Sequence, residues 1–589
     1  MRSETSNVKR QTCPAPGVLR LVRGVPNPDG ARGAQMFLFV GDPTVAPVRE
    51  VVPDEGVALP GPPDGLAAHP FRLRILHFND LHGRISRLTG YGIQPVLSRI
   101  VWRLRELRRR YRDDPHSAVI ALSAGDDFAG GAFDSGYQLY SAAGVDVGVL
   151  GNHDFDRGTQ RLAQAIRQGA RFPLLSANLI GDRWLNVPYH PAVLLVVGGV
   201  RVGIVGLTTR AEIKYRAGSD FRLADPVETA RNLLPAVRPL CDVLILLSHL
   251  GHSLSSHAAV VCDAGDVELA ASLPRGIVHL IVGGHTHHAM NERGLSVDNV
   301  VNGIPIVQAG VEGRFLGEVN VTLRGRYTTV TDARLTCTAD LPVDESFERE
   351  HVQPVVARWL SFLARSLGRT ADHPDLGADA VRNEFAAGES ALANFISDGL
   401  VVRCRAAGQA VDFAMIDRAS VNYGLPVGGQ LTLGDWFRLM PYADVVRVCE
   451  ITGHQLTALL EDNARRADRP DEPHVERGFL HFSRQVRYTI TLDESRSAAR
   501  VVEAAFGGRP LEEQLERIFL VACIGFVRRR VASWEAQHSS LPLLDVQALP
   551  CRSTDLILRD EMIAYVREHG GVTEEAGATR DGRVELKDL

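Results

Sequence analysis

Short apolar runs alternate with amphipathic stretches over most of the first half of the chain. Eight runs beginning near Phe71 are short and rich in aliphatic residues, as buried strands are, and the stretches between them repeat apolar residues every three or four positions. The strand-like runs are residues 72–78, 118–123, 145–150, 172–179, 201–207, 242–248, 278–284 and 304–310. The helix-like stretches are residues 92–111, 157–168 and 227–238. This alternation predicts a layered α/β core.

The pattern changes on both sides of this core, which we place at residues 70–338. Residues 1–69 are rich in Pro and Gly and have no helical period, so we expect an N-terminal extension with a few strands or a surface path. Residues 345–369 carry apolar residues along one side and predict a linker helix. Residues 370–572 mix helix-like and strand-like segments in a smaller second unit, and the polar residues 573–589 are expected to fray as a tail.

Composition and charge narrow the classes of partner. The 589 residues include 65 basic and 70 acidic side chains, a net charge of −5, which gives no global attraction to nucleic acid. The basic run at residues 103–112 lies beside apolar residues at helical spacing, so we interpret its arginines as a solvated helix face. We therefore expect no nucleic-acid partner.

The cysteines and the apolar stretches indicate the cellular compartment of the protein. The 8 cysteines include no C-x-x-C pair and lie mostly in strand-like contexts, which indicates small buried side chains in a reducing compartment. The N-terminus shows no apolar segment of the secretory type. The longest apolar stretch, residues 192–207, is interrupted by glycines and Arg201, so it does not predict a membrane span. The expectation is a cytoplasmic protein without a membrane segment.

Polar side chains follow five of the predicted strands directly. Ligands of open α/β sheets collect beyond the carboxyl ends of strands, so these groups are expected to meet. Their members are Asp80, His82, Asp126, Asn152, His249, His285 and His287. Each alone is weak evidence, because a single histidine after a strand is more often a surface residue. Together they form a mixed nitrogen and oxygen set that suits two divalent ions of intermediate softness.

Five blocks around these residues resemble, in order, those of the calcineurin-like metallophosphoesterases and, within them, the 5′-nucleotidase family. The blocks are HFNDLHG, SAGDDFAGG, GNHDFD, SHLG and GGHTHH. The resemblance implies a four-layer α-β-β-α sandwich, followed by the linker helix and a smaller α/β C-terminal specificity domain. It also implies two divalent metal ions, for which Mn, Zn, Fe and Co are all open.

The same resemblance implies a role for each of these residues. One ion would be held by Asp80, His82, Asp126 and His287. The other would be held by Asp126, Asn152, His249 and His285, so that Asp126 bridges. His153 would be catalytic, stabilising charge on the transferred phosphoryl group or the leaving oxygen, and Asp156 would hold its imidazole.

The second unit resembles the family's specificity domain, with departures. Residues 419–422 read Ala-Ser-Val-Asn where relatives carry Gly-Gly-Ile-Arg, and residues 386–388 lack a second expected arginine. Asn422 could hydrogen-bond a phosphate group, but an amide cannot neutralise its charge as a guanidinium does. Tyr442 and Phe479 match the two rings between which relatives stack a base.

These observations favour one function and leave two alternatives. The first hypothesis is a phosphomonoesterase of 5′-nucleotidase type that uses a metal-activated hydroxide on a small phosphorylated substrate, possibly a nucleotide. The altered specificity domain motivates the second, a phosphodiesterase or pyrophosphohydrolase acting on cyclic nucleotides or nucleotide sugars. The third is a non-catalytic binding protein with the same fold, which retention of all seven ligand positions makes the weakest.

Overall fold

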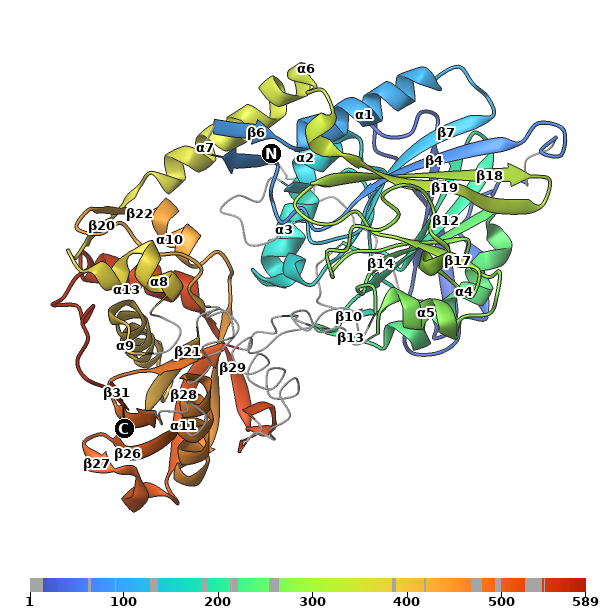
Figure 1. Cartoon of the computed structure of the whole chain (residues 1–589). Helices are drawn as coiled ribbons and strands as arrows, with labels where there is room; N and C mark the ends of the chain where they lie inside the picture. The colour runs from blue at the N-terminus through green and yellow to red at the C-terminus, as the bar shows by residue number, and fades with distance from the viewer. Residues whose placement is uncertain are drawn as a thin grey trace, which may run out of the picture. The chain divides into compact units, whose positions relative to one another are not determined.

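The computed structural model describes most of the chain. It covers residues 14–61, 65–89, 92–127, 136–181, 188–211, 213, 221–253, 264–383, 388–417, 420–467, 479–492, 499–524, 543–544 and 546–588. The chain forms two compact units, the first ending at Val356 and the second beginning at Ala357 (Figure 1). Among the described helices, none combines the length and the apolar character that crossing a membrane requires.

Two sheets form the centre of the first unit. One has six strands in the order β19-β18-β4-β7-β8-β9. Their bounds are Phe71–Phe78 (β4), Ser117–Ser123 (β7), Val147–Val149 (β8), Leu174–Leu175 (β9), Phe315–Arg324 (β18) and Tyr327–Cys337 (β19). The other has nine strands in the order β16-β17-β15-β14-β12-β11-β2-β1-β3. Its C-terminal members are Ala192–Val197 (β11), Val200–Thr208 (β12), Val243–His249 (β14), Leu280–Val282 (β15), Val300–Val301 (β16) and Ile304–Val307 (β17).

The two sheets share one apolar core, because alternate residues of each strand point to the same face. Leu73 and Ile75 of β4 lie in one buried cluster with Ile204 of β12 and Ile245 of β14. The opposite face of the nine-stranded sheet packs against helices α4 (Pro226–Val237) and α5 (Asp266–Ser272). Helix α1 (Leu97–Arg110) packs on β7 of the six-stranded sheet, and α2 (Gly136–Ala143) packs on α3 (Thr159–Gly169), away from α4 and α5 (Figure 1). The four-layer prediction is therefore confirmed.

The N-terminal residues supply three strands to this sheet, so of the two expected alternatives, a few strands or a surface path, the structure contains the strands. Strands β1 (Val18–Gly24), β2 (Gln35–Val40) and β3 (Glu50–Pro53) continue the nine-stranded sheet, with β2 antiparallel to β11. Leu19 and Phe37 are buried in the cluster beneath α4. The alternating apolar residues of Val18–Gly24 carry the strand signal, which the surrounding Pro and Gly residues obscure.

Two arginines of α1 are tied to acidic side chains. Arg103 Nε donates to Glu318 Oε1 at 2.9 Å, and Arg108 Nη2 donates to Asp146 Oδ2 at 2.7 Å. Both arginine side chains are only 17% exposed. The interpretation of this basic run as a fully solvated face is thus wrong for these two residues, because their acidic partners come from segments far away in sequence.

The predicted linker helix ends earlier than expected. Helical structure runs through α6 (Glu345–Phe347), a π-helical turn (Glu348–Val352) and α7 (Gln353–Leu363). Residues 366–369 are not helical, because they belong to β20 (Ser366–Thr370), which pairs with β22 (Gln430–Thr432) and β30 (Gly571–Val572). Gly368 has φ 133°, and a β-carbon there would lie 2.0 Å from the carbonyl oxygen of Gly570. The close pairing therefore requires glycine at this position.

The second unit is built on a five-stranded sheet in the order β24-β21-β28-β23-β29. Its strands are Phe413–Asp417 (β21), Val445–Thr452 (β23), Leu480–Phe482 (β24), Ile518–Ile524 (β28) and Cys551–Ile557 (β29). Its longer helices are α9 (Ala391–Ala406), α11 (Gly453–Ala467) and α13 (Leu558–Glu568). Trp436 lies fully buried in the apolar core of this unit. The α/β character predicted for this unit is confirmed.

The C-terminal residues are ordered by pairing, so the expectation of a frayed tail is wrong. Strand β31 (Val584–Asp588) lies parallel to β25 (Val486–Leu492). Arg583, only 2% exposed, donates to Asp398 at 2.9 Å and to Asp581 at 2.8 Å. A buried guanidinium needs such partners, and they anchor the start of the strand.

Two cysteines face each other across neighbouring strands of the second unit. Cys449 of β23 is the direct antiparallel partner of Cys551 of β29, and the two are joined as a disulfide with Cα atoms 4.0 Å apart. The interpretation of all cysteines as reduced is wrong for this pair, because strand register brings them together. Of the remaining described cysteines, Cys241, Cys404 and Cys523 are buried free thiols.

Peptide mapping under non-reducing conditions is expected to recover Cys449 and Cys551 in one linked peptide. Reduction should lower the free energy of unfolding of the second unit by about 4–5 kcal/mol, because a bond closing a separation of 102 residues limits the unfolded chain. Chemical denaturation with and without reductant measures the difference. A double Cys→Ser variant at both positions is the control, and a reductant effect that persists in it would contradict the assignment.

Candidate metal centre

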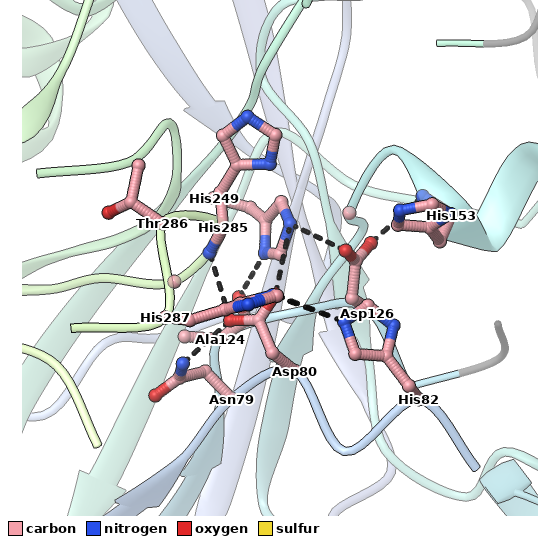
Figure 2. A network of polar contacts seen from close by, with 12 residues as sticks. Asn79, Asp80, His82, Ala124, Asp126, His153, His249, His285, Thr286 and His287 are labelled. Atoms are coloured by element: carbon pink, nitrogen blue, oxygen red, sulfur yellow. Dashed lines mark hydrogen bonds and ion pairs between the residues drawn. The ribbon is translucent and has the colours of Figure 1, made fainter. Parts of the chain in front are cut away.

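The carboxyl ends of five strands from the two sheets meet at one rim. Asp80 and His82 follow β4, Asp126 follows β7, and Asn152 follows β8, while His249 ends β14. His285 and His287 follow β15. Figure 2 shows the side chains of Asp80, His82, Asp126, His249 and His287 directed toward one another. Parallel registers of β4 with β7 and of β14 with β15 bring these ends together.

The side-chain atoms lie at ligand-like separations. His249 Nε2 is 3.1 Å from Asp126 Oδ2 and 3.8 Å from Asp80 Oδ1. His287 Nε2 is 3.4 Å from Asp80 Oδ1. Three overlapping groups each place all their ligand atoms within 4.8 Å of one another: Asp80, His82 and His287; His82, Asp126 and His153; Asp126, His249 and His285.

The backbone at this rim is held in an unusual conformation. Five of the seven predicted ligands have positive φ: Asp80 (51°), His82 (47°), Asp126 (56°), His285 (77°) and His287 (61°). Side chains other than glycine adopt this region rarely, and such strained residues collect at functional sites. The turns after the strands therefore aim these side chains inward at an energetic cost that the surrounding fold must offset.

Gly151 lies in the loop after β8, directly before the Asn-His-Asp sequence, where a side chain would not fit. A β-carbon on Gly151 would lie 2.1 Å from Asp126 Oδ1 and 2.5 Å from the Asp126 backbone nitrogen. The Gly151 backbone nitrogen donates to Asp154 Oδ2 at 2.7 Å, which fixes the turn from within. Glycine is thus required for the loops after β7 and β8 to approach each other, and sequence reasoning assigned no role to Asp154.

Several inward-facing polar atoms suit a cation. Among the described residues, no hydrogen-bond partner is found for Asp80 Oδ1 or Asn152 Oδ1, although both are buried. Buried polar atoms are nearly always satisfied, so a cluster of unsatisfied acceptors points to a ligand that bonds to them. Carboxylate, amide and imidazole donors of this kind fit divalent cations of intermediate softness.

The electrostatics of the cluster also favour positive charge inside it. Burial opposes protonation of His249, but Asp126 and Asp80 outweigh it and raise the pKa of His249 to about 10. Burial also opposes ionisation of Asp126, yet the charge of His249 outweighs it, and the pKa of Asp126 lies well below its usual range. Burial lowers the pKa of His82 to about 4, which keeps this imidazole in the neutral form that binds metals. The carboxylates thus hold cationic partners strongly.

A second set of groups orients the predicted ligands. Asn79 Nδ2 donates to Asp80 Oδ2 at 2.6 Å and to the carbonyl oxygen of Gly310 at 2.7 Å. His249 Nδ1 lies 2.6 Å from the carbonyl oxygen of Ala124, which directs Nε2 of the same ring into the centre (Figure 2). Sequence reasoning assigned no role to Asn79 or Ala124, and only the position of Asn79 next to Asp80 could have suggested one.

His153 and Asp156 lie together at the edge of the cluster. His153 Nδ1 is 2.9 Å from Asp156 Oδ2, and the backbone nitrogen of His153 donates to Asp126 Oδ1 at 2.9 Å. The His153 side chain is 17% exposed, so it can meet a molecule that enters from solvent. Its ring centre is 5.2 Å from that of His82. The two residues predicted to be catalytic are therefore adjacent to the predicted metal ligands.

Asp266 is a buried carboxyl group at the start of α5, next to β14. It is fully buried and accepts a hydrogen bond from Ser248 Oγ at 2.5 Å. Burial raises the pKa of Asp266 to about 7, and the Ser248 hydrogen bond only partly opposes this shift. The folded state therefore holds a proton that the unfolded chain releases near pH 4.

We expect wild-type protein to lose stability as the pH rises from about 4 to about 7, relative to an Asp266→Asn variant. The reason is that the folded pKa of about 7 lies above the unfolded value of 3.8, so this group contributes most below both values and its contribution is lost as the pH passes through the folded pKa. Thermal unfolding of both proteins at matched metal concentration measures the difference. Parallel pH curves would contradict the buried neutral carboxyl.

The three predicted substrate contacts differ in accessibility. Tyr442 is 52% exposed, and Asn422 is also exposed. Phe479 is 1% exposed and belongs to the apolar core of the second unit, so its ring has no open face for a base. Asn422 occupies the position of one absent arginine, and residues 386–387, in the stretch expected to carry the other, lie outside the described residues.

Two family profiles match the chain. The calcineurin-like phosphoesterase profile matches residues 73–289, and the profile of the 5′-nucleotidase C-terminal domain matches residues 366–530. Together they span more than half of the chain in the order that the resemblance implied. The chain belongs to the 5′-nucleotidase family of calcineurin-like metallophosphoesterases. Members of this family are metal-dependent hydrolases of phosphoesters.

The curated relatives of this chain have names that refer to nucleotides. The trifunctional nucleotide phosphoesterase protein YfkN of Bacillus subtilis is 26% identical over 490 residues, which are 75% of this chain but only 30% of YfkN. The 5′-nucleotidase of Vibrio cholerae is 26% identical over 428 residues, 66% of this chain and 74% of that protein.

Solved structures of the family share the fold. The 5′-nucleotidase precursor of Thermus thermophilus aligns with a TM-score of 0.52 at 24% identity, over 88% of this chain and 99% of that one. The NAD nucleotidase of Haemophilus influenzae aligns with a TM-score of 0.55 at 18% identity, over 88% of this chain and 100% of that one. At these identities the likeness concerns the fold alone.

Proposed function

We propose that this chain hydrolyses phosphomonoesters at a centre for two divalent ions, with a nucleoside 5′-monophosphate as substrate. The observation that carries the proposal is the set of three overlapping ligand groups at one strand rim, two of which share Asp126. The family supports phosphomonoester hydrolysis with a metal centre and does not favour the phosphodiesterase alternative. The names of the curated relatives support a nucleotide as the substrate.

The proposed ligands divide between two ions. Asp80, His82, Asp126 and His287 would hold one, and Asp126, Asn152, His249 and His285 the other. The identity of the metals stays open among Mn, Zn, Fe and Co. When bound, a pair of such ions polarises phosphoryl oxygens and lowers the pKa of water.

Residues of the chain supply positioning and a proton donor. Asn79 and the carbonyl oxygen of Ala124 fix the orientation of Asp80 and His249, so that the ligand atoms face the substrate site without reorganisation. Asp156 holds His153 through Nδ1, and Nε2 of the same ring would donate a proton toward the phosphoryl group or the leaving oxygen. Tyr442 is proposed to stack on the base, and Asn422 to hydrogen-bond the substrate.

Turnover of a substrate panel by metal-reconstituted protein tests the proposal. The panel contains nucleoside 5′-monophosphates, p-nitrophenyl phosphate, a cyclic nucleotide and a nucleotide sugar, and phosphorus NMR identifies the products. We expect inorganic phosphate from the monoesters, lost on chelation and restored by Mn²⁺. Cleavage of the cyclic nucleotide or the sugar nucleotide without any phosphate released from monoesters would overturn the proposal.

The compartment is a separate part of the proposal. The sequence predicts the cytoplasm, but the Cys449–Cys551 disulfide favours an oxidising compartment, because such bonds are rare where thiols are kept reduced. Alkylation of free thiols in intact cells, followed by peptide mapping, distinguishes the two. A linked peptide under those conditions places the chain in an oxidising environment.

A further inference from the structure

One buried carboxamide contacts both ends of the turn that carries the two proposed histidine ligands after β15. Gln308 follows β17 directly and is fully buried. Its Nε2 donates to the carbonyl oxygen of Gly284 at 2.7 Å, and its Oε1 accepts from the backbone nitrogen of His288. Gln308 therefore spans residues 284–288, which we call the ligand turn.

The two ends of the ligand turn need opposite hydrogen-bonding groups. The carbonyl oxygen at one end needs a donor, and the N–H group at the other end needs an acceptor. A carboxamide offers both on separate atoms, whereas a carboxylate has no donor and a guanidinium has no acceptor. The hydroxyl of Thr286, whose side chain points away from the ligand side chains in Figure 2, also donates to Gln308 Oε1 at 3.4 Å. The glutamine is thus matched to the whole turn.

The ligand turn needs this support because its backbone is strained. His285 has φ 77° and His287 has φ 61°, a region that side chains other than glycine occupy only where the surrounding structure holds them. A relaxed turn would aim both imidazoles elsewhere. His287 is proposed to hold one ion and His285 the other, so relaxation of this one turn would weaken both sites together.

The backbone that follows Gln308 extends the support to the other sheet. The backbone nitrogen of Ala309 donates to Asn79 Oδ1 at 2.8 Å, and Asn79 in turn orients Asp80. The backbone nitrogen of His285 donates to Asp80 Oδ2 at 2.9 Å. The strand end that carries Gln308 therefore fixes the ligand turn relative to a carboxylate that comes from β4.

We propose that Gln308 is a positioning residue of the metal centre, which sets its affinity for both ions by holding the ligand turn in the strained conformation. Gln308 acts through the backbone of the turn and is not itself a ligand. Groups that orient metal ligands in this way contribute about 10–100-fold to metal affinity. The inference rests on the proposed function, since it concerns the ions that this function requires.

Calorimetric titration of the metal-free full chain with Mn²⁺ tests the proposal without turnover. Gln308→Met keeps an unbranched side chain and removes both the donor and the acceptor. We expect the Kd values of both ions to rise about 10–100-fold. Wild-type affinity in this variant would overturn the proposal.

The matched control is Asn463→Leu, which removes a fully buried amide of the second unit. Asn463 Nδ2 donates to the carbonyl oxygen of Leu480 at 2.9 Å, and its Oδ1 accepts from the Leu480 nitrogen at 2.7 Å. This variant loses the same kind of contacts but should keep both Kd values within about twofold of wild type. Equal losses of metal affinity in the two variants would overturn the proposal, because loss of any buried amide would then have the same effect.

Hydrogen exchange of the wild-type chain provides a test that needs no variant. The N–H group of His288 donates to a side chain, so its protection reports whether Gln308 holds the turn before any ion binds. We expect this amide to exchange at least about 100-fold more slowly in the metal-free protein than in an unstructured peptide. Exchange at the rate of an unstructured peptide would overturn the proposal, whether or not Gln308→Met folds.

The metal dependence of hydrolysis distinguishes failure of this inference from failure of the proposed function. Gln308→Met should need about 10–100-fold more Mn²⁺ for half-maximal turnover of p-nitrophenyl phosphate, with KM and kcat at saturating Mn²⁺ within about threefold of wild type. Weakened metal binding in Gln308→Met, in a chain whose wild type hydrolyses no phosphomonoester, would overturn the proposed function and support the role of Gln308. Unchanged metal binding by Gln308→Met, with an active wild type, would overturn the role of Gln308 alone.

Discussion

Asp126→Asn is expected to leave fewer than two ions bound per chain and to lower kcat for phosphomonoester hydrolysis at least about 1,000-fold. Both Asp126 oxygens are engaged at the centre: Oδ1 accepts from the backbone nitrogen of His153 at 2.9 Å, and Oδ2 lies 3.1 Å from His249 Nε2. An asparagine there offers one oxygen and no charge, so it cannot replace a carboxylate shared by two ligand groups. Metal content by mass spectrometry and steady-state kinetics on p-nitrophenyl phosphate measure both effects.

The adjacent carboxyl group provides a matched control for this substitution. Burial and the charge of Asp154 raise the pKa of Asp127 well above its usual range, and Ser123 Oγ donates to it at 2.6 Å. Because this favours the neutral form, Asp127→Asn should retain both ions and most activity. If Asp126→Asn kept two ions, or if Asp127→Asn lost them equally, the bridging role of Asp126 would be wrong.

The sequence predicted the position of the centre because strand ends are a topological property. Once Asp80 and Asp126 are each placed directly after a strand of a parallel pair, the sheet brings them to the same rim without knowledge of the loops. The groups that orient the ligands could not be predicted in this way. The carbonyl oxygen of Ala124 carries no side-chain signal, and the hydrogen bond from Asn79 depends on positive φ at Asp80.

Strands at or next to the edges of sheets were a second part of the fold that the sequence did not predict clearly. The strand Val18–Gly24 lies next to the edge strand β3 and pairs with both β2 and β3, but the Pro and Gly residues around it left a surface path as open as a few strands. Polar side chains in Val584–Asp588 similarly favoured a frayed tail, whereas the strand lies at the edge of its sheet and pairs with only one neighbour. Edge strands bury one face at most, so their composition resembles that of loops.

Aromatic residues show the same limit at the proposed substrate site. Tyr442 and Phe479 matched the stacking rings of relatives equally well by sequence, yet one is 52% exposed and the other 1%. Exposure depends on the packing of surrounding helices and strands, which a local motif does not encode. Asp444 lies on the same loop as Tyr442, whereas Arg559 beside them comes from α13, so only the structure brings the two charged groups together.

His153→Ala is expected to lower kcat about 100–1,000-fold while both ions stay bound, because it removes a preorganised donor to charge that develops on the substrate. The imidazole also lies within a possible ligand group with His82 and Asp126, so the structure alone permits a second role as a metal ligand. The two roles predict different metal contents. Mass spectrometry of the purified variant, paired with kinetics at saturating Mn²⁺, measures both, and loss of an ion would contradict the catalytic role.

Two further substitutions define what the His153 result means. Asp156→Asn keeps a side chain of the same shape beside His153 Nδ1 but removes the carboxylate charge 2.9 Å away, so it should lower kcat less than the loss of the imidazole and shift the pH profile of kcat. His252→Ala, which removes a ring 5.1 Å from that of His288 and outside the proposed ligand set, should stay within about twofold of wild type. If His252→Ala lost as much activity as His153→Ala, any histidine at this rim would matter equally. In that case, the pairing with Asp156 would not single out His153 as the proton donor.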